Sequence, residues 1–81
     1  MATGTVLFFN TNDPRGSYGF IVDDAVGDET QRDLNVFFGD RGLSEETLIV
    51  RKGQRVQFEY DPNSMQNGRG PRAAIGSVSV I

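Results

Sequence analysis

The stretch that decides the fold is Gly16-Ser17-Tyr18-Gly19-Phe20-Ile21. The side chains of a β-strand point alternately to its two faces, so Tyr18 and Phe20 share one face and Gly19 and Ile21 share the other. Both faces of this strand therefore carry large apolar side chains. A half-buried strand has a polar face instead, so this pattern needs an explanation.

A second stretch, Asn35-Val36-Phe37-Phe38, has the same property, because Phe37 opposes Val36 and Phe38. A chain of 81 residues has room for one hydrophobic core, which cannot take up both sets of apolar side chains. If the core receives Ile21 with Val36 and Phe38, the remaining rings point outward together. The sequence therefore predicts an exposed aromatic patch, formed by Tyr18, Phe20 and Phe37.

The rest of the chain consists of short apolar groups separated by glycine, proline and asparagine, without a convincing helical period. The clearest alternation places Val56, Phe58 and Tyr60 on one face of a strand. We predict a single all-β domain over residues 1–81. Its five expected strands are Thr3–Asn10, Tyr18–Asp23, Leu34–Phe38, Gln54–Tyr60 and Ala73–Val80.

The composition excludes several kinds of chemistry. The chain has no Cys and no His, which excludes disulfides, thiolate or imidazole metal ligands, and catalysis by either group. No carboxylate pair is joined to a nucleophile or to a phosphate-cradling glycine loop, so we expect no enzyme activity, no cofactor or metal, and no small-molecule substrate. The acidic stretch Asp23–Asp33 lacks the ligand spacing of a calcium loop and is expected to be solvated.

The charge of the chain limits the kind of partner. A net charge of −3 argues against a protein that holds duplex nucleic acid mainly through phosphate contacts. Arg15, Arg69 and Arg72 stand apart from the acidic stretch, which leaves room for a locally neutral or basic face. No signal-peptide pattern and no membrane-spanning apolar run is found, so we expect a cytoplasmic protein.

Taken together, these segments resemble the cold-shock domain family. Gly16–Ile21 is similar to the first ribonucleoprotein motif of that family, and Asn35–Phe38 is similar to the second. Gly4–Asn10, Gly53–Glu59 and Gly68–Ala74 look like its first strand, its fourth strand and the entry to its last strand, in the same order. The resemblance covers nearly the whole chain. It implies a closed, five-stranded antiparallel β-barrel of the oligonucleotide-binding type (OB-fold).

The resemblance also implies a function. Cold-shock domains hold single-stranded RNA or DNA across strands one to three by stacking bases on aromatic side chains, in the manner of an RNA chaperone or a regulator of expression. Phe8 stands where the family usually has Trp and is expected to point outward, and Phe9 is expected to be partly buried beside the patch. The candidate nucleic-acid-binding residues are Phe8, Phe9, Tyr18, Phe20, Phe37, Arg15 and Arg69.

Two departures from the family pattern predict a shortened site. Leu7 replaces the usual Lys, and Gly39-Asp40 stand where a His-Phe pair normally extends the stacking surface. One cation and two rings are therefore missing, and a carboxylate is added. We expect fewer stacked bases and an edge that repels phosphate.

Two other interpretations of the aromatic residues stay open. The rings could form a cross-strand aromatic ladder or pack in the core. They could also form the surface of a protein-interaction or dimerisation module whose nucleic-acid binding has been weakened or lost. We expect a monomer or a weak homodimer, and titration with an oligothymidine distinguishes a nucleic-acid-binding protein from a protein-interaction module.

Overall fold

A computed structural model describes residues 2–11, 16–25, 35–45, 47, 49–62 and 71–81. It shows one five-stranded sheet in the order β3-β2-β1-β4-β5, with every neighbouring pair antiparallel. The strands are β1 (Ala2–Asn10), β2 (Tyr18–Asp23), β3 (Val36–Gly39), β4 (Arg55–Phe58) and β5 (Ser79–Val80), and one 3-10 turn, η2 (Asp40–Gly42), follows β3. The described residues contain no α-helix, which confirms the predicted all-β class and the five-stranded antiparallel sheet.

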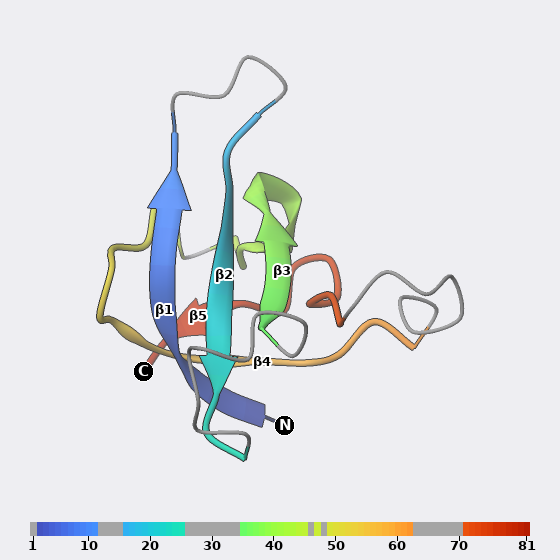
Figure 1. Cartoon of the computed structure of the whole chain (residues 1–81). Coiled ribbons are helices and arrows are strands. Elements are labelled where there is room, and N and C mark those ends of the chain that lie inside the picture. The colour runs from blue at the N-terminus through green and yellow to red at the C-terminus, as the bar shows by residue number, and fades with distance from the viewer. Residues whose placement is uncertain (1, 12–15, 26–34, 46, 48, 63–70) are drawn as a thin grey trace.

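The longest strand, β1, holds the sheet together. It pairs with β2 through Gly4–Asn10 and with β4 through Ala2–Thr5. Figure 1 shows β1, β2 and β3 side by side, with β4 and β5 crossing behind them. The core lies between these two layers, so each front strand has an inner face toward the core and an outer face toward solvent.

The predicted closure into a barrel is not found. β3 and β5 are the two edges of the sheet, and no strand ladder joins them in the part of the chain that the structure describes. The described C-terminal residues meet the β3 side through isolated parallel bridges, Phe37 to Arg72 and Leu43 to Val78, and through a hydrogen bond from the Gly76 N–H to the Arg41 carbonyl at 2.9 Å.

The single strand expected over Ala73–Val80 is also wrong, because a turn divides it. Gly76 has a φ of +73°, a left-handed conformation that glycine adopts at little cost. The backbone N–H of Ser77 donates to the carbonyl of Ala74 at 3.1 Å and closes the turn. Only Ser79 and Val80 then remain in a ladder with β4. The turn is the physical reason why the last segment leaves the sheet open.

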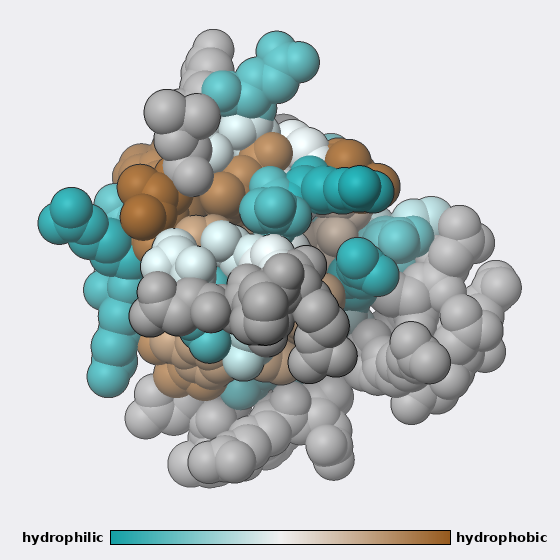
Figure 2. Space-filling model, turned by 90° about the horizontal axis from the view of Figure 1, so that it is seen from above, coloured by the Kyte–Doolittle hydropathy of each residue, from teal (hydrophilic) through white to brown (hydrophobic). Residues whose placement is uncertain are grey.

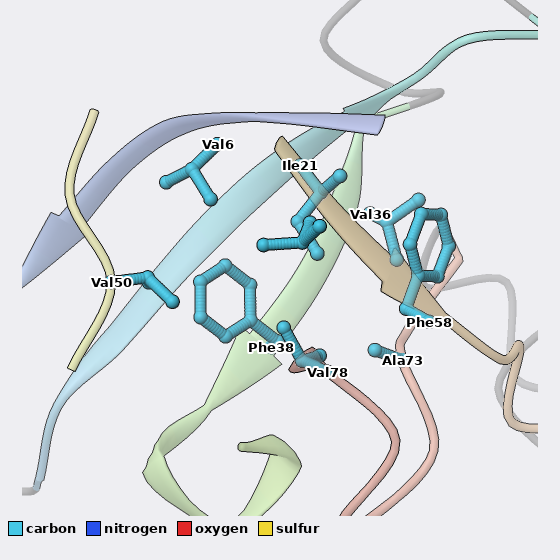
Figure 3. Close-up of a cluster of buried hydrophobic side chains, with 9 residues drawn as sticks. Val6, Ile21, Val36, Phe38, Val50, Phe58, Ala73 and Val78 are labelled. Carbon is cyan, nitrogen blue, oxygen red and sulfur yellow. The ribbon is translucent and has the colours of Figure 1, made fainter. Parts of the chain in front are cut away.

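Nine buried apolar residues form the core (Figure 3). They are Val6, Ile21, Val36, Phe38, Val50, Val56, Phe58, Ala73 and Val78. Every strand except the short β5 contributes to this cluster, and fully burying one such side chain contributes roughly 1.5–3 kcal/mol. The predicted inward direction of Ile21, Val36 and Phe38 is confirmed, since each is 0% exposed.

No helix in the described ranges is long and apolar enough to cross a membrane.

Candidate functional site

Four aromatic rings lie together on the outer face of the three front strands, and we call them the aromatic quartet. They are Phe8 from β1, Tyr18 and Phe20 from β2, and Phe37 from β3. Each ring contacts two others, so the quartet forms a closed cycle. The centroid distances around it are 6.0 Å for Phe8–Tyr18, 6.2 Å for Tyr18–Phe37, 5.7 Å for Phe37–Phe20 and 5.6 Å for Phe20–Phe8.

Strand register explains why rings from distant parts of the sequence meet. Phe20 lies directly opposite Phe8 on one side and opposite Phe37 on the other, and residues directly opposite each other point to the same face of a sheet. Tyr18 lies opposite Gly39. Because Gly39 has no side chain, nothing at that position competes with Phe37 for contact with the Tyr18 ring. The three rings predicted to point outward therefore form one surface.

A bulge at Leu7 places Phe8 on this surface. Val6 pairs with Ile21 and Phe8 pairs with Phe20, so Leu7 is an extra residue in β1. Strict alternation from the buried Val6 would direct Phe8 inward. With the bulge, Phe8 points outward and is 38% exposed.

The same bulge directs Phe9 to the opposite face. The Phe9 ring packs against the core and stacks on Phe38 with a centroid distance of 5.5 Å. Phe9 is therefore partly buried beneath the outer surface, and its described ring contact is with the core rather than with the quartet.

Gly19 lets β1 and β2 approach each other behind the quartet. A Cβ at this position would lie 2.3 Å from the carbonyl oxygen of Phe8 and 2.9 Å from Cζ of Phe38. The first contact is sterically impossible unless the backbone shifts, and the second requires the Phe38 ring to move. Packing therefore explains why a glycine stands between two aromatic residues in Tyr18-Gly19-Phe20. The two rings lie on the outer face, and the inner face has no room for a side chain at position 19.

Arg72 adds a positive charge at the edge of the quartet. Its guanidinium carbon lies 5.4 Å from the centroid of the Phe37 ring, within the range of a cation–π interaction. The backbone holds it there, since the Phe37 N–H donates to the Pro71 carbonyl at 3.0 Å and the Ala73 N–H donates to the Phe37 carbonyl at 2.8 Å. Sequence reasoning set Arg72 apart from the acidic stretch but did not place it in the site. Only the pairing of residues 37 and 72 reveals it.

An open hollow of about 370 Å³ adjoins the quartet. Tyr18 and Phe37 line it together with Arg72 and with Asp40 from η2. Two of its other lining residues are Gly16 and Gly39, which have no side chains to fill the space.

Two further predicted residues, Arg15 and Arg69, lie outside the described residues. The quartet, Arg72 and the hollow are therefore the described parts of the candidate site. Among the described residues, no group of acidic side chains is placed so that it could hold a metal ion.

Polar contacts cluster at the other end of β2. Arg55 of β4 donates from Nη1 to Oδ1 of Asp24 at 2.6 Å and from Nη2 to Oδ2 at 2.5 Å. These hydrogen bonds lower the pKa of the Asp24 carboxyl from 3.8 to about 2. Nearby, the Tyr60 hydroxyl donates to the buried Asp23 carboxylate, and burial, aided by this bond, raises the pKa of Tyr60. These contacts join β2 to β4 and its continuation.

Seen from above, the surface of the described residues is mixed. Figure 2 shows brown apolar areas with teal hydrophilic ones between them. Large apolar side chains outside the quartet are also exposed, and among the described residues Ile75 is the most exposed, at 77%.

Comparison with models of known protein families finds no family that matches this chain. A search of curated proteins finds no significant match either. The function is therefore argued from the site itself.

Proposed function

We propose that this protein binds single-stranded RNA or DNA by stacking bases on the aromatic quartet. The observation that supports this proposal best is the closed cycle of four rings on the outer face of three adjacent strands. Every base has a π-face, so such a platform accepts many sequences and contributes roughly 1–3 kcal/mol for each stacked base. A duplex keeps its bases paired and stacked on one another, which leaves no free face for the rings.

The charge of the protein favours stacking as the main source of affinity. The net charge of −3 opposes the general attraction that duplex-binding proteins exert on phosphate. At the quartet, Arg72 brings a cation to the Phe37 ring, where it can contact a base face or a phosphate. On this proposal the protein acts in the cytoplasm without catalysis, as an RNA chaperone or a regulator of expression.

We further propose that the sheet is an open variant of the OB-fold barrel, of the cold-shock type. The OB-fold in general is a five-stranded, partly open barrel that binds oligonucleotides on the face of its second and third strands. Three features support the assignment: the strand order, the parallel bridges between the β3 side and the C-terminal segment, and the position of the quartet.

The test is a titration of a fluorescently labelled oligothymidine of about seven nucleotides, followed by anisotropy. We expect Phe20→Ala or Phe37→Ala to weaken binding by about 1–3 kcal/mol, because each removes one ring from the stacking surface. Ile75→Ala is the matched control, since it removes an exposed apolar side chain that lies outside the quartet. It should bind like the parent.

Circular dichroism of each variant shows whether the fold is retained. If folded Phe20→Ala and Phe37→Ala variants both bind like the parent, the quartet is not the binding surface. If the parent protein binds no oligonucleotide and instead forms a dimer in sedimentation velocity, the quartet is a protein-interaction surface.

A further inference from the structure

The hollow beside the quartet has the size and the walls of a site for one base. Its volume of about 370 Å³ lies near the lower end of the roughly 300–1,000 Å³ typical of small-molecule sites. Tyr18 and Phe37 supply aromatic surface on its wall, with their rings inclined by only 22°. A planar heterocycle can stack against such a wall.

The hollow is open because glycine stands at position 39. Apart from its two chain neighbours, the nearest described atom to a Cβ at this position would be the Ser17 carbonyl oxygen, at 3.7 Å, so a side chain at position 39 would extend into open space. Gly39 lies opposite Tyr18, and a side chain at position 39 would therefore share the outer face with that ring. Its absence leaves one side of Tyr18 accessible from the hollow.

Asp40 supplies the carboxylate of the hollow, whose lining also includes the donor side chains of Ser17 and Arg72. Its backbone N–H donates to the Ser17 carbonyl at 3.0 Å, which fixes the start of η2 beside the strand. The carboxylate oxygens lie 3.7 and 4.0 Å from the point where a Cβ of Gly16 would be. Asp40 is exposed, and an ionised carboxylate can only accept hydrogen bonds.

The four bases differ in what they offer to such an acceptor. The Watson–Crick edge of guanine has two adjacent donors, N1–H and the N2 amino group, which match the two oxygens of a carboxylate. Adenine and cytosine each have one amino donor beside a ring nitrogen that accepts. Thymine and uracil have one N–H between two carbonyl oxygens, which would face the carboxylate with like charge. Paired hydrogen bonds to a base edge discriminate between bases by roughly fivefold to a hundredfold in affinity.

We propose that the hollow is a subsite for one guanine base, which stacks on Tyr18 and Phe37 and donates from N1 and N2 to the Asp40 carboxylate. This inference rests on the proposed single-strand binding and adds a base preference to it. The quartet accepts any base, whereas the hollow selects one. Asp40, which repels phosphate in general, becomes favourable where guanine occupies the hollow.

The experiment compares oligothymidine with the same oligomer carrying one central guanine, adenine or cytosine. We expect the parent protein to bind the guanine oligomer about tenfold more tightly than oligothymidine, the low end for a paired contact because the hollow is open to water. Adenine and cytosine should give smaller gains. A single guanine avoids the self-association of guanine runs.

The decisive variant is Asp40→Asn, whose amide presents one acceptor and one donor in place of two acceptors. It should reduce the ratio of guanine to thymine affinity to within about twofold of unity. Removing a negative charge strengthens binding of every oligomer alike, and this contribution cancels in the ratio. Glu45→Gln makes the same change of charge at an exposed residue that does not line the hollow, and it should retain the tenfold ratio.

The outcomes separate this inference from the proposed function. If the parent binds oligothymidine but shows no guanine preference, the guanine subsite is wrong and single-strand binding stands. A preference that survives unchanged in Asp40→Asn also overturns the subsite, because guanine would then be read elsewhere. If no oligomer binds at all, both proposals fail.

Discussion

Phenylalanine occurs on both the inner and the outer face of the front strands, but its surroundings differ between the two faces. In β3, Phe38 points inward and is 0% exposed, while its neighbour Phe37 belongs to the quartet outside. In β1, Phe9 packs against the core, whereas Phe8 is exposed. An inner ring is surrounded by core side chains, but an outer ring is supported mainly by other rings. Loss of an inner ring should therefore cost stability, and loss of an outer ring should cost binding.

The largest effect is expected from breaking the inner face at Phe38. Phe38→Ala leaves a cavity in a core that encloses the ring completely, so the free energy of unfolding should fall by about 3–5 kcal/mol. Phe37→Ala, one residue earlier, loses partly exposed ring contacts and should cost less than about 2 kcal/mol. Urea denaturation of both variants measures the difference.

This neighbouring pair makes the comparison sharp, because the two variants change the same residue type in the same strand. Equal losses of stability would contradict the division of the rings into a structural set and a binding set. The quartet would then be a cross-strand aromatic ladder whose main effect is on folding.

A smaller loss of stability is expected from a substitution at Gly19, on the inner face of β2. Gly19→Ala places a Cβ against the Phe8 carbonyl oxygen and the Phe38 ring. The backbone of β1 must shift, which should cost about 1–3 kcal/mol of unfolding free energy. The control is Gly39→Ala, whose Cβ would have only an ordinary contact with Ser17, and it should change stability by less than about 1 kcal/mol. Similar values in both variants, measured by urea denaturation, would show that the close approach at Gly19 is relaxed in solution.

The stacking surface on the outer face can also be extended by adding aromatic rings. Replacing Gly39→His and Asp40→Phe together adds rings beside Tyr18 and removes a carboxylate. Position 39 has an extended backbone, with φ of −101°, which any residue adopts. Oligothymidine binding should tighten by up to about 1–3 kcal/mol, less the cost of ordering the new side chains.

Anisotropy titration of this double variant measures the gain, and Asp40→Asn alone shows how much of it comes from the lost charge. A folded double variant with unchanged affinity would mean that the strand does not pass over this edge of the sheet. The variant should also lose any preference for guanine, because the carboxylate is gone.

The smallest effect is expected away from the quartet, at Asp24. Its pKa is about 2 in the folded protein and 3.8 as an ordinary carboxyl, so the ionised form is favoured by folding. The stability that this contributes is fully present above pH 4 and is lost as the pH falls from about 4 to about 2. Because both side chains are solvent-exposed, the effect should be small.

Urea midpoints measured between pH 2 and pH 5 test this prediction. Asp24→Asn should flatten the acid limb of the stability curve slightly and leave oligonucleotide affinity at neutral pH close to that of the parent. An acid limb that is identical in both proteins would show that the contacts between Arg55 and Asp24 do not persist in solution.

The sequence alone determined the first four strands, though not the last, and the direction of most of their side chains. β2 has the predicted bounds Tyr18–Asp23, and the alternation in β2 and β3 correctly separated buried from outward residues. The reason is local: a strand has a period of two, so a few apolar residues in one strand are enough to assign its faces. The candidates Arg15 and Arg69 stay predictions, because they lie outside the described residues.

Only the tertiary structure decided the features that depend on pairing between distant segments. The outward direction of Phe8 was expected, but the bulge at Leu7 that produces it shifts the register of β1 against β2, and no pattern within β1 specifies that bulge. Arg72 reaches Phe37 because residues far apart in the chain share backbone hydrogen bonds. The turn at Gly76 divides the last strand and leaves the sheet open. Register and closure depend on contacts across the whole sheet, and the period of a single strand contains no information about them.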